Sequence, residues 1–278
     1  MSGKVWFITG CSSGIGRTLA EVLLATSGAR VACTSRSLQS IADVAGANDQ
    51  NFLALEVDLA SEASVQLAIT SATAKFGTID VLVNNAGYGQ VGAVEDLSDE
   101  ELKKNYEINF FAPLRVIRLV APLMRAQKSG YIINVSSMGA LVSYQCFSSY
   151  CSTKSALNMA TEALASELKP FGVKALSINP GCFKTDFFSA NKIQVPSNIN
   201  DSVYNEQYQK TFFEPTKNLD ALLIGDPTKL ANLFIEVVEH QGDLPVHIYV
   251  GTDAHALVRA KAEQILKDLD TWAPRTNF

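Results

Sequence analysis

The chain has 278 residues, of which 47% are apolar and 18% are charged, and its formal net charge is −5. This composition is ordinary for a globular protein, and an acidic chain without a block of lysine or arginine is a poor match for nucleic acid. Its apolar runs are too short for a secretory signal or a membrane span, so we expect a cytoplasmic protein.

Short β-branched runs alternate with longer segments of helical period along the chain. The predicted strands are Lys4–Thr9, Arg30–Thr34, Phe52–Glu56, Ile79–Val83, Tyr131–Val135, Val173–Ile178 and Val246–Val250. The predicted helices include Ile15–Thr26, Ser61–Phe76, Asp99–Gln127, Tyr150–Lys169 and Pro227–Glu239. This alternation predicts right-handed βαβ units in an α/β fold: a Rossmann-type, doubly wound, seven-stranded parallel sheet with helices on both faces.

No repeat or linker divides the sequence, so we expect a single domain over residues 1–278. The one irregular region is Phe187–Leu223, which contains several Asn and Pro residues. Connections of this length in compact domains usually serve function. We therefore predict an insertion at about 187–223 that covers the substrate.

The cysteines and histidines give no sign of a disulfide framework or a metal site. The five cysteines are odd in number, scattered and without a Cys-x-x-Cys pair, so most of them should be small buried hydrophobes. The three histidines lie late in the chain without His-Glu-x-x-His spacing, and we expect them at the surface or satisfied in the core. No metal is predicted.

A glycine-rich turn, Thr9–Gly16, joins the first predicted strand to the first predicted helix. Its glycines permit a tight turn and let backbone N–H groups approach a pyrophosphate at the helix N-terminus. The spacing is Gly-x-x-x-Gly-x-Gly rather than the Gly-x-Gly-x-x-Gly of many dehydrogenases. A purely structural turn is the alternative, but the first βα turn of a parallel sheet favours a dinucleotide.

The end of the second strand discriminates between the two nicotinamide dinucleotides. An acid at this point would hold the ribose hydroxyls of NAD, whereas a basic residue pairs with the 2′-phosphate of NADP. The sequence has Ser35-Arg36 and no acid there, which favours NADP(H). A solvated surface arginine is the alternative for Arg36, and the same choice applies to Arg17, a possible helper.

Two further strand ends supply candidates for the adenosine side. Asp58 follows the third strand, where it could bind the adenine amino group or simply cap a helix. Asn84–Gly87 follows the fourth strand and would bring small residues and backbone close to the adenosine.

The sharpest pattern is the Tyr-x-x-x-Lys pair of Tyr150 and Lys154, which share a helix face at i and i+4. A lysine cation and an oxidised nicotinamide would both favour phenolate and lower the pKa of the tyrosine toward neutrality. Ser136 and Ser137 end the fifth strand, at the edge where ligands bind in such sheets. Asn179–Asp186 leaves the sixth strand and could close over the nicotinamide.

Taken together, these motifs resemble the short-chain dehydrogenase/reductase family over essentially the whole chain, and within it the 17β-hydroxysteroid-dehydrogenase-like group. The resemblance implies that Tyr150 is the general acid and base, that Ser137 binds the substrate oxygen, and that Lys154 holds the nicotinamide ribose. It assigns Asn109 to a proton relay that positions Lys154 through water. It also implies a homo-oligomer, formed through the Asp99–Gln127 and Tyr150–Lys169 helices.

The family's cofactor contacts carry over to matching positions of this chain. The predicted cofactor-binding residues are Gly10, Ser12, Ser13, Gly14, Ile15, Gly16, Ser35, Arg36, Asp58, Leu59, Asn85, Ala86, Gly87, Tyr150, Lys154, Pro180, Gly181, Phe183 and Thr185. The predicted substrate contacts are Ser137, Val142, Tyr144, Phe147, Tyr150 and Phe187, with Phe183, Tyr204, Tyr208, Phe212 and Phe213 as further walls. Apolar residues at these positions favour an apolar, aromatic or steroid-like ketone or alcohol, although plain core is the alternative for each.

The expected activity is hydride transfer between NADP(H) and a carbonyl carbon, used reductively in the cell. Two other functions are weighed against it. A cofactor-sensing regulator would bind NADP(H) without turnover, but it would not need the Ser137, Tyr150, Lys154 and Asn109 set. An epimerase or dehydratase acting on nucleotide sugars usually has Gly-x-x-Gly-x-x-Gly spacing, which this chain lacks.

Overall fold

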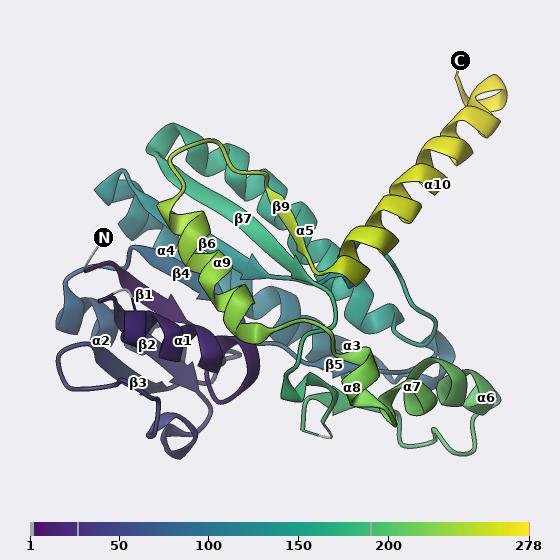
Figure 1. The fold of residues 1–278 in the computed structure, drawn as a ribbon, viewed down its shortest axis with the longest axis horizontal. Helices are drawn as coiled ribbons and strands as arrows, with labels where there is room; N and C mark the ends of the chain where they lie inside the picture. The colour runs from purple at the N-terminus through teal and green to yellow at the C-terminus, as the bar shows by residue number, and fades with distance from the viewer. Residues whose placement is uncertain (1–2, 27, 190, 278) are drawn as a thin grey trace.

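The computed structural model describes residues 3–26, 28–189 and 191–277 of the chain. Across these residues, seven parallel strands form one sheet in the order β3-β2-β1-β4-β6-β7-β9 (Figure 1). The strands are β1 (Val5–Ile8), β2 (Arg30–Ser35), β3 (Phe52–Glu56), β4 (Val81–Asn84), β6 (Gly130–Val135), β7 (Val173–Pro180) and β9 (His247–Val250). The predicted fold class is confirmed, and each predicted strand is present within a few residues of its expected bounds.

Helices cover both faces of this sheet. The first face carries α1 (Gly14–Thr26) and α9 (Pro227–Glu239), and the second carries α2 (Glu62–Phe76), α4 (Ala112–Gln127) and α5 (Ser148–Leu168). Each face has its own buried apolar cluster, so neither side of the central strands is open to water. Burial on both faces explains why these strands read as nearly continuous apolar runs.

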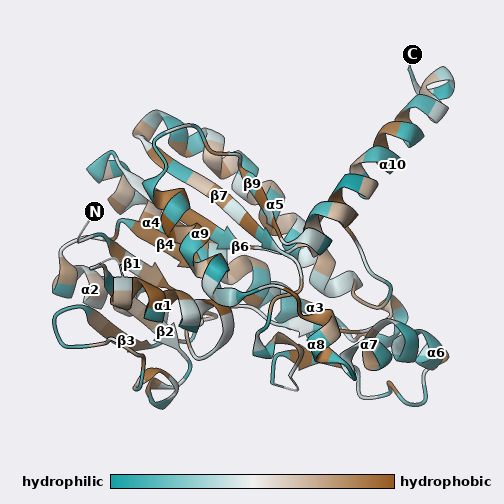
Figure 2. Cartoon of the chain, viewed as in Figure 1, coloured by the Kyte–Doolittle hydropathy of each residue, from teal (hydrophilic) through white to brown (hydrophobic). Residues whose placement is uncertain are grey.

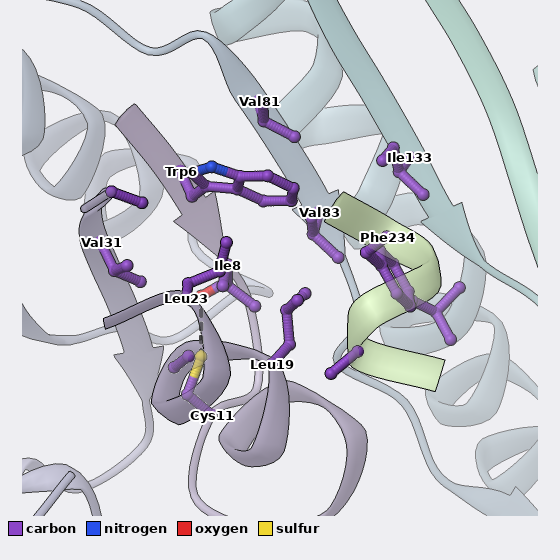
Figure 3. Packing of buried hydrophobic residues seen from close by; sticks show 14 of the residues in the cluster. Trp6, Ile8, Cys11, Leu19, Leu23, Val31, Val81, Val83, Ile133 and Phe234 are labelled. Atoms are coloured by element: carbon purple, nitrogen blue, oxygen red, sulfur yellow. Dashed lines mark hydrogen bonds between the residues drawn. The ribbon is translucent and has the colours of Figure 1, made fainter. Parts of the chain in front are cut away.

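The side chains of β1 show how the two cores are divided. Trp6 and Ile8 point into the cluster under α1 and α9, where they meet Leu19 and Phe234 (Figure 3). Val5 and Phe7 alternate with them and point into the cluster under α2 and α4. This period of two is the ordinary geometry of a strand, and it fixes the register of the central strand between two helical layers.

The strand order reverses between β1 and β4. From β1 the chain moves outward through β2 and β3, and it then returns to place β4 on the other side of β1. The helices that follow β1 and β4 therefore lie on opposite faces of the sheet, α1 on one and α4 on the other, which leaves a crevice at the carboxyl ends of the strands. Open α/β sheets bind their ligands at such a switch point.

The predicted Asp99–Gln127 helix is interrupted, which corrects the expectation of a regular helix. It consists of α3 (Asp99–Tyr106), a π-helical turn (Glu107–Phe111) and α4. The extra residue of a π turn rotates the side chains that follow it, and such turns are frequent at functional sites. This one contains Asn109, which is fully buried.

The segment that follows β7 contains several short elements. They are the 3₁₀ turn Asp186–Phe188, β8 (Ile193–Gln194), α6 (Asn205–Tyr208), a π turn (Gln209–Phe213), α7 (Glu214–Thr216) and α8 (Leu219–Leu222). Strand β8 pairs in parallel with β5 (Gly89–Gln90). Residue 190 of the predicted lid lies outside the described residues. Further 3₁₀ turns span Leu38–Ile41, Val94–Asp96, Met138–Ala140 and Lys169–Phe171.

The chain ends in α10 (Thr252–Thr276), a helix that the sequence analysis did not predict. It begins directly after β9 and projects away from the rest of the molecule (Figure 1). Ala254 in its first turn is buried, whereas residues 259–272 are all exposed. None of the helices in the described ranges has the length and apolar character needed to cross a membrane.

Candidate active site

A cavity of about 1360 Å³ opens at the carboxyl ends of the strands. Its walls come from the glycine-rich turn after β1, from the loops after β2, β3, β4 and β6, from α5, and from the segment after β7. Most of the predicted cofactor residues line it: Gly10, Ser12, Ser13, Gly14, Ile15, Ser35, Arg36, Asp58, Leu59, Asn85, Ala86, Gly87, Tyr150, Lys154, Pro180, Gly181, Phe183 and Thr185. Two remote motifs, the glycine turn and the Tyr-x-x-x-Lys pair, thus face one space.

The loops after β1 and β4 are fastened to each other. The Thr9 hydroxyl accepts hydrogen bonds from the backbone N–H groups of Asn85 and Ala86, at 3.0 and 3.1 Å. Gly10 has φ +73°, and a Cβ there would lie 2.8 Å from the Ala86 Cα. Only glycine satisfies both the conformation and the close approach. The two joined loops lie at the start of α1, and the N-terminus of a helix is a place where anionic groups bind.

Gly16 has a different task from the other glycines of the turn. A Cβ at Gly16 would lie 2.4 Å from the side-chain nitrogen of Asn85 and 2.7 Å from the Gly10 carbonyl oxygen. Gly16 is not among the cavity-lining residues. It therefore acts through close packing of α1 on the sheet, which sequence spacing alone does not separate from a ligand contact.

The two arginines that could meet a 2′-phosphate are in contrasting surroundings. Arg17 bonds Glu21 at 2.7 Å and Asp43 at 2.9 Å, and it also donates to the backbone carbonyls of Ser40 and Asp43. These carboxylates raise the pKa of Arg17 further. Arg36 lines the cavity, is exposed, and makes no hydrogen bond or ion pair within the described part of the chain. Arg17 is thus a structural residue, and Arg36 is available to a ligand.

Asp58 does not cap a helix, because the N-cap of α2 is Ser61. Its Oδ1 accepts a hydrogen bond from the Ala60 N–H at 3.0 Å, just before the Ser61 cap of α2. Asp58 and Leu59 also line the cavity, beside Val57. The carboxylate therefore shapes the turn after β3 at the cavity wall.

Tyr150 and Ser137 lie together on the cavity wall. Burial raises the pKa of the Tyr150 phenol, while a hydrogen bond with the Ser137 side chain acts in the opposite direction. The predicted lowering of this pKa is therefore not found. The physical reason is burial, because the phenolate form would lose its hydration in the wall of the cavity. The Lys154 ammonium lies 5.8 Å from the centroid of the tyrosine ring. Ser136, the alternative to Ser137, donates its hydroxyl to the Lys154 carbonyl and is buried.

Lys154 lines the cavity but is buried, and its ammonium donates a hydrogen bond to the Val135 carbonyl oxygen at 2.9 Å. Burial lowers the pKa of Lys154 to about 8, because the charged form loses hydration. A lysine in this state changes its charge easily near neutral pH. It can hold a polar ligand group or pass on a proton.

Asn109 approaches Lys154 from the π turn. Its amide accepts a hydrogen bond from the Tyr88 N–H at 3.0 Å and donates to the Tyr88 carbonyl at 2.9 Å. It also donates to the Thr153 hydroxyl at 3.2 Å, one residue before Lys154. A Cβ on Gly87 would lie 3.1 Å from the Asn109 Oδ1 and 3.5 Å from the Lys154 Nζ, so both groups border this glycine.

The predicted substrate walls divide into two groups. Tyr144, Phe147, Phe183, Phe187 and Phe212 line the cavity, and the Tyr150 and Phe187 rings are 5.6 Å apart. Val142, Tyr204, Tyr208 and Phe213 are not among its lining residues. Tyr204 and Phe213 belong instead to the small apolar cluster that holds the 187–223 segment together, and Tyr208 is fully buried within it.

One contact of the site was missed by the sequence analysis. In the loop after β7, the Cys182 N–H donates a 2.7 Å hydrogen bond to the Asp253 carboxylate, which lies at the start of α10. A Cβ on Gly181 would lie 2.2 Å from the Asp253 Oδ1. In the sequence, only the glycine at position 181 indicates that another group comes close, and it does not show that this group is Asp253.

The comparisons with known proteins agree with this geometry. Residues 4–195 match a family model described as short chain dehydrogenase. An oxidoreductase of Botryotinia fuckeliana, BOA17, is 32% identical over 273 residues, which is 97% of this chain and 96% of that protein. A solved short-chain dehydrogenase from Streptomyces avermitilis has a TM-score of 0.87 and 33% identity, covering 99% of this chain and 98% of its own. The chain therefore belongs to the short-chain dehydrogenase family.

Members of this family bind a nicotinamide cofactor, and solved relatives hold either form. A 3-ketoacyl-(acyl-carrier-protein) reductase from Brucella melitensis was solved with NADH, at 27% identity and a TM-score of 0.74, covering 90% of this chain and 97% of its own. A metagenomic short-chain oxidoreductase was solved with NADP, at 25% identity and a TM-score of 0.69, with the same coverage. The chain is thus an oxidoreductase of a nicotinamide-dependent class.

Proposed function

We propose that this protein is an NADP(H)-dependent carbonyl reductase or alcohol dehydrogenase that acts on an apolar ketone or secondary alcohol. One observation carries the proposal: Ser137, Tyr150 and Lys154 face the same cavity as the glycine turn, with Asn109 alongside. A dinucleotide bound along Gly10–Ile15 would place its nicotinamide end at these side chains.

In the proposed reduction, the bound cofactor supplies a hydride to the carbonyl carbon. Tyr150 donates its phenol proton to the carbonyl oxygen, and Ser137 donates a hydrogen bond to the same oxygen and stabilises the charge that develops there. The raised pKa of the Tyr150 phenol keeps it protonated and able to act as an acid. In the reverse direction the same phenol oxygen takes the proton of the alcohol.

Lys154 and Asn109 restore the proton in this proposal. The Lys154 ammonium holds the ribose hydroxyls of the nicotinamide nucleoside, and its pKa of about 8 allows it to return a proton toward Tyr150. Asn109 is fixed by its two hydrogen bonds with Tyr88 and orders a water next to Lys154. The π turn supports this role because it brings a buried amide to the edge of Gly87.

The preference for NADP(H) rests on Arg36. No acid follows β2, and Arg36 is exposed and lines the cavity beside the buried Ser35. A guanidinium in this position can form a charge-assisted, bidentate contact with a 2′-phosphate. The ion pairs of Arg17 leave this contact to Arg36.

An apolar, aromatic or steroid-like substrate is supported by the rings around Tyr150. Phe147, Phe187 and Phe212 line the substrate end, and the Tyr144 hydroxyl is buried there without a hydrogen-bond partner among the described residues. A ring-walled cleft with few polar groups selects for apolar molecules and orients them by those groups. The five unpaired cysteines suit a reducing compartment, which supports a cytoplasmic location.

The test is consumption of NADPH and of NADH with a panel of apolar ketones, diketones, quinones and steroids, run beside Tyr150→Phe. We expect NADPH to be consumed with a strong preference and Tyr150→Phe to lose about 10²–10⁴-fold in kcat while still binding NADPH. Binding of NADPH without turnover on any panel member would favour a cofactor sensor. A preference for NADH would remove the role of Arg36.

A further inference from the structure

The helix α10 leaves an apolar stripe uncovered. Ile265, Leu269 and Trp272 are 40%, 62% and 57% exposed, although each lies in the same helix as the buried Ala254. Figure 2 shows apolar and polar residues interspersed along the length of this projecting helix. A helix of 25 residues is roughly 37 Å long, and most helical stability in proteins comes from packing of an apolar face. The exposed part of α10 is therefore a surface built for a partner.

The spacing of the stripe specifies the kind of partner. Val258, Ala262, Ile265, Leu269 and Trp272 follow one another at intervals of four, three, four and three residues. This is the a/d repeat of a helix that packs against one other helix along a coiled-coil seam. Leu266, which is 62% exposed, lies at the neighbouring e position and widens the apolar face on one side of the seam.

The charges of α10 divide along its length. Within the exposed residues 259–272, the first half carries Arg259, Lys261 and Glu263 and is net basic. The second half carries Lys267, Asp268 and Asp270 and is net acidic. A second α10 laid parallel would place the acidic half beside the acidic half. A second α10 laid antiparallel would place each half against its opposite, so self-pairing favours the antiparallel arrangement.

One antiparallel register satisfies both the seam and the charges. It places Val258 of one copy opposite Leu269 of the other, and Ala262 opposite Ile265, so that a small side chain faces a large one. Lys261 and Asp268 both occupy the g position of the heptad, and in this register they face each other across the seam, once on each side of the two-fold axis. Shifting the register by one heptad brings Asp268 against Asp268 and Lys261 against Arg275.

We propose that α10 is an assembly arm that binds, antiparallel, to the α10 arm of a second copy of this chain. A lipid surface fits this helix less well, because acidic residues are mixed with basic ones around the stripe and would meet anionic headgroups. The family resemblance implies an oligomer formed through the Asp99–Gln127 and Tyr150–Lys169 helices. Those helices lie on faces of the protein other than α10. If those faces also pair, the arms join two such dimers.

The experiment is a charge-swap cycle followed by sedimentation equilibrium over a range of protein concentrations at low salt. The full chain is compared with Lys261→Glu, with Asp268→Lys and with the double variant. Each single variant creates two like-charge contacts in the proposed register and should weaken association about tenfold, or halve the mass of a larger assembly. The double variant restores both contacts with reversed sign and should recover association.

The matched controls lie on the same helix. Lys267→Glu and Asp270→Lys make the same charge changes at the outward f and b positions, and they should leave association unchanged. All four sites are exposed, so circular dichroism should show the same fold throughout. A monomeric parent chain, equal losses in the single and double variants, or binding of the parent chain to phosphatidylserine vesicles without any effect of the swaps would overturn the proposal.

Discussion

The Asp253 carboxylate accepts a 2.7 Å hydrogen bond from the backbone N–H of Cys182. This contact ties the start of α10 to the loop that follows β7. In the same loop, Gly181 donates its N–H to the Val250 carbonyl, at the end of β9. The loop after β7, which forms one side of the cavity, is thus held in place by hydrogen bonds to β9 and α10.

The first prediction concerns this tie. Asp253→Ala leaves the Cys182 N–H without its acceptor, so the loop should become less ordered and the KM for NADPH should rise about tenfold. Asp270→Ala, farther along the same helix, should leave KM unchanged. Steady-state kinetics at varied NADPH concentration measures both.

A second readout separates positioning from general destabilisation. Burial, and then the nearby Asp253 carboxylate, raise the pKa of the Cys182 thiol to about 11. In Asp253→Ala this pKa should fall, so alkylation of Cys182 should begin at a lower pH than in the parent chain. An unchanged alkylation profile together with a lowered melting temperature would assign Asp253 a merely structural role.

The charged form of Lys154 should lower the free energy of unfolding, because its ammonium is buried. Its pKa is lowered to about 8 in the fold, against an ordinary value of 10.5, so the unfolded chain binds a proton more readily between these two values. The stability of the parent chain should therefore gain as pH rises from about 8 toward 10.5, and the penalty is fully present below 8. Lys154→Met should lose turnover, yet be relatively more stable at pH 7 than at pH 10.

Melting temperatures of the parent chain and Lys154→Met, measured from pH 7 to pH 10, test whether the stability changes with pH in the predicted direction. The difference in melting temperature between Lys154→Met and the parent chain should shrink as pH rises. A difference that is constant from pH 7 to pH 10 would contradict a charged Lys154 in a buried site.

Arg36 and Arg17 offer a paired test of cofactor choice. Arg36→Ala removes the cation beside the cavity, so the KM for NADPH should rise about tenfold or more while the KM for NADH stays the same. Arg17→Ala breaks the ion pairs with Glu21 and Asp43 and should lower the melting temperature without altering the NADPH preference. A loss of preference in Arg17→Ala alone would reverse the two roles.

Asp96 anchors the 187–223 segment. Its carboxylate accepts hydrogen bonds from Ser202, Tyr208 and Asn198. We expect Asp96→Ala to raise the KM for bulky ketones several-fold, because the segment loses its anchor, and to leave the KM for NADPH unchanged. Equal changes in both constants would argue against a substrate lid.

The pH dependence of this anchor follows from the same bonds. The Ser202 and Tyr208 hydroxyls hold the pKa of Asp96 below its ordinary value. A lowered pKa means that the anchor is intact at neutral pH and is lost as pH falls through that lowered value. The parent chain should therefore approach the substrate KM of Asp96→Ala only in acid.

The strands and the sheet could be predicted from the sequence because their signals are local. Val5, Phe7 and their neighbours are apolar on both faces, and glycines mark the turns that follow. The catalytic candidates were found for a similar reason, since Tyr150 and Lys154 are one helical turn apart. The parallel sheet indicates a hydroxyl at the end of the fifth strand, and the resemblance to the family selects Ser137 rather than Ser136 there.

The features that were missed depend on the third dimension or on an absent partner. The π turn at Asn109 leaves no mark in an otherwise regular helical pattern. Tyr208 reads as a pocket wall, but its hydroxyl bonds Asp96 about a hundred residues away in the chain. Helix α10 has a helical period, but it packs little against the rest of the protein, so its sequence lacks the broad apolar face of a core helix.

If α10 joins two copies as proposed, its position links assembly to cofactor binding thermodynamically. Asp253, at the start of α10, accepts a hydrogen bond from the loop after β7, which lines the cavity. The exposed end of the same helix is the arm proposed to bind a second copy. If pairing of two α10 helices also orders the hydrogen bond between Asp253 and Cys182, it raises the affinity of the loop after β7 for the dinucleotide. Reciprocity then requires the dinucleotide to tighten pairing by the same factor. The cell's ratio of free to bound cofactor would set the population of assembled enzyme.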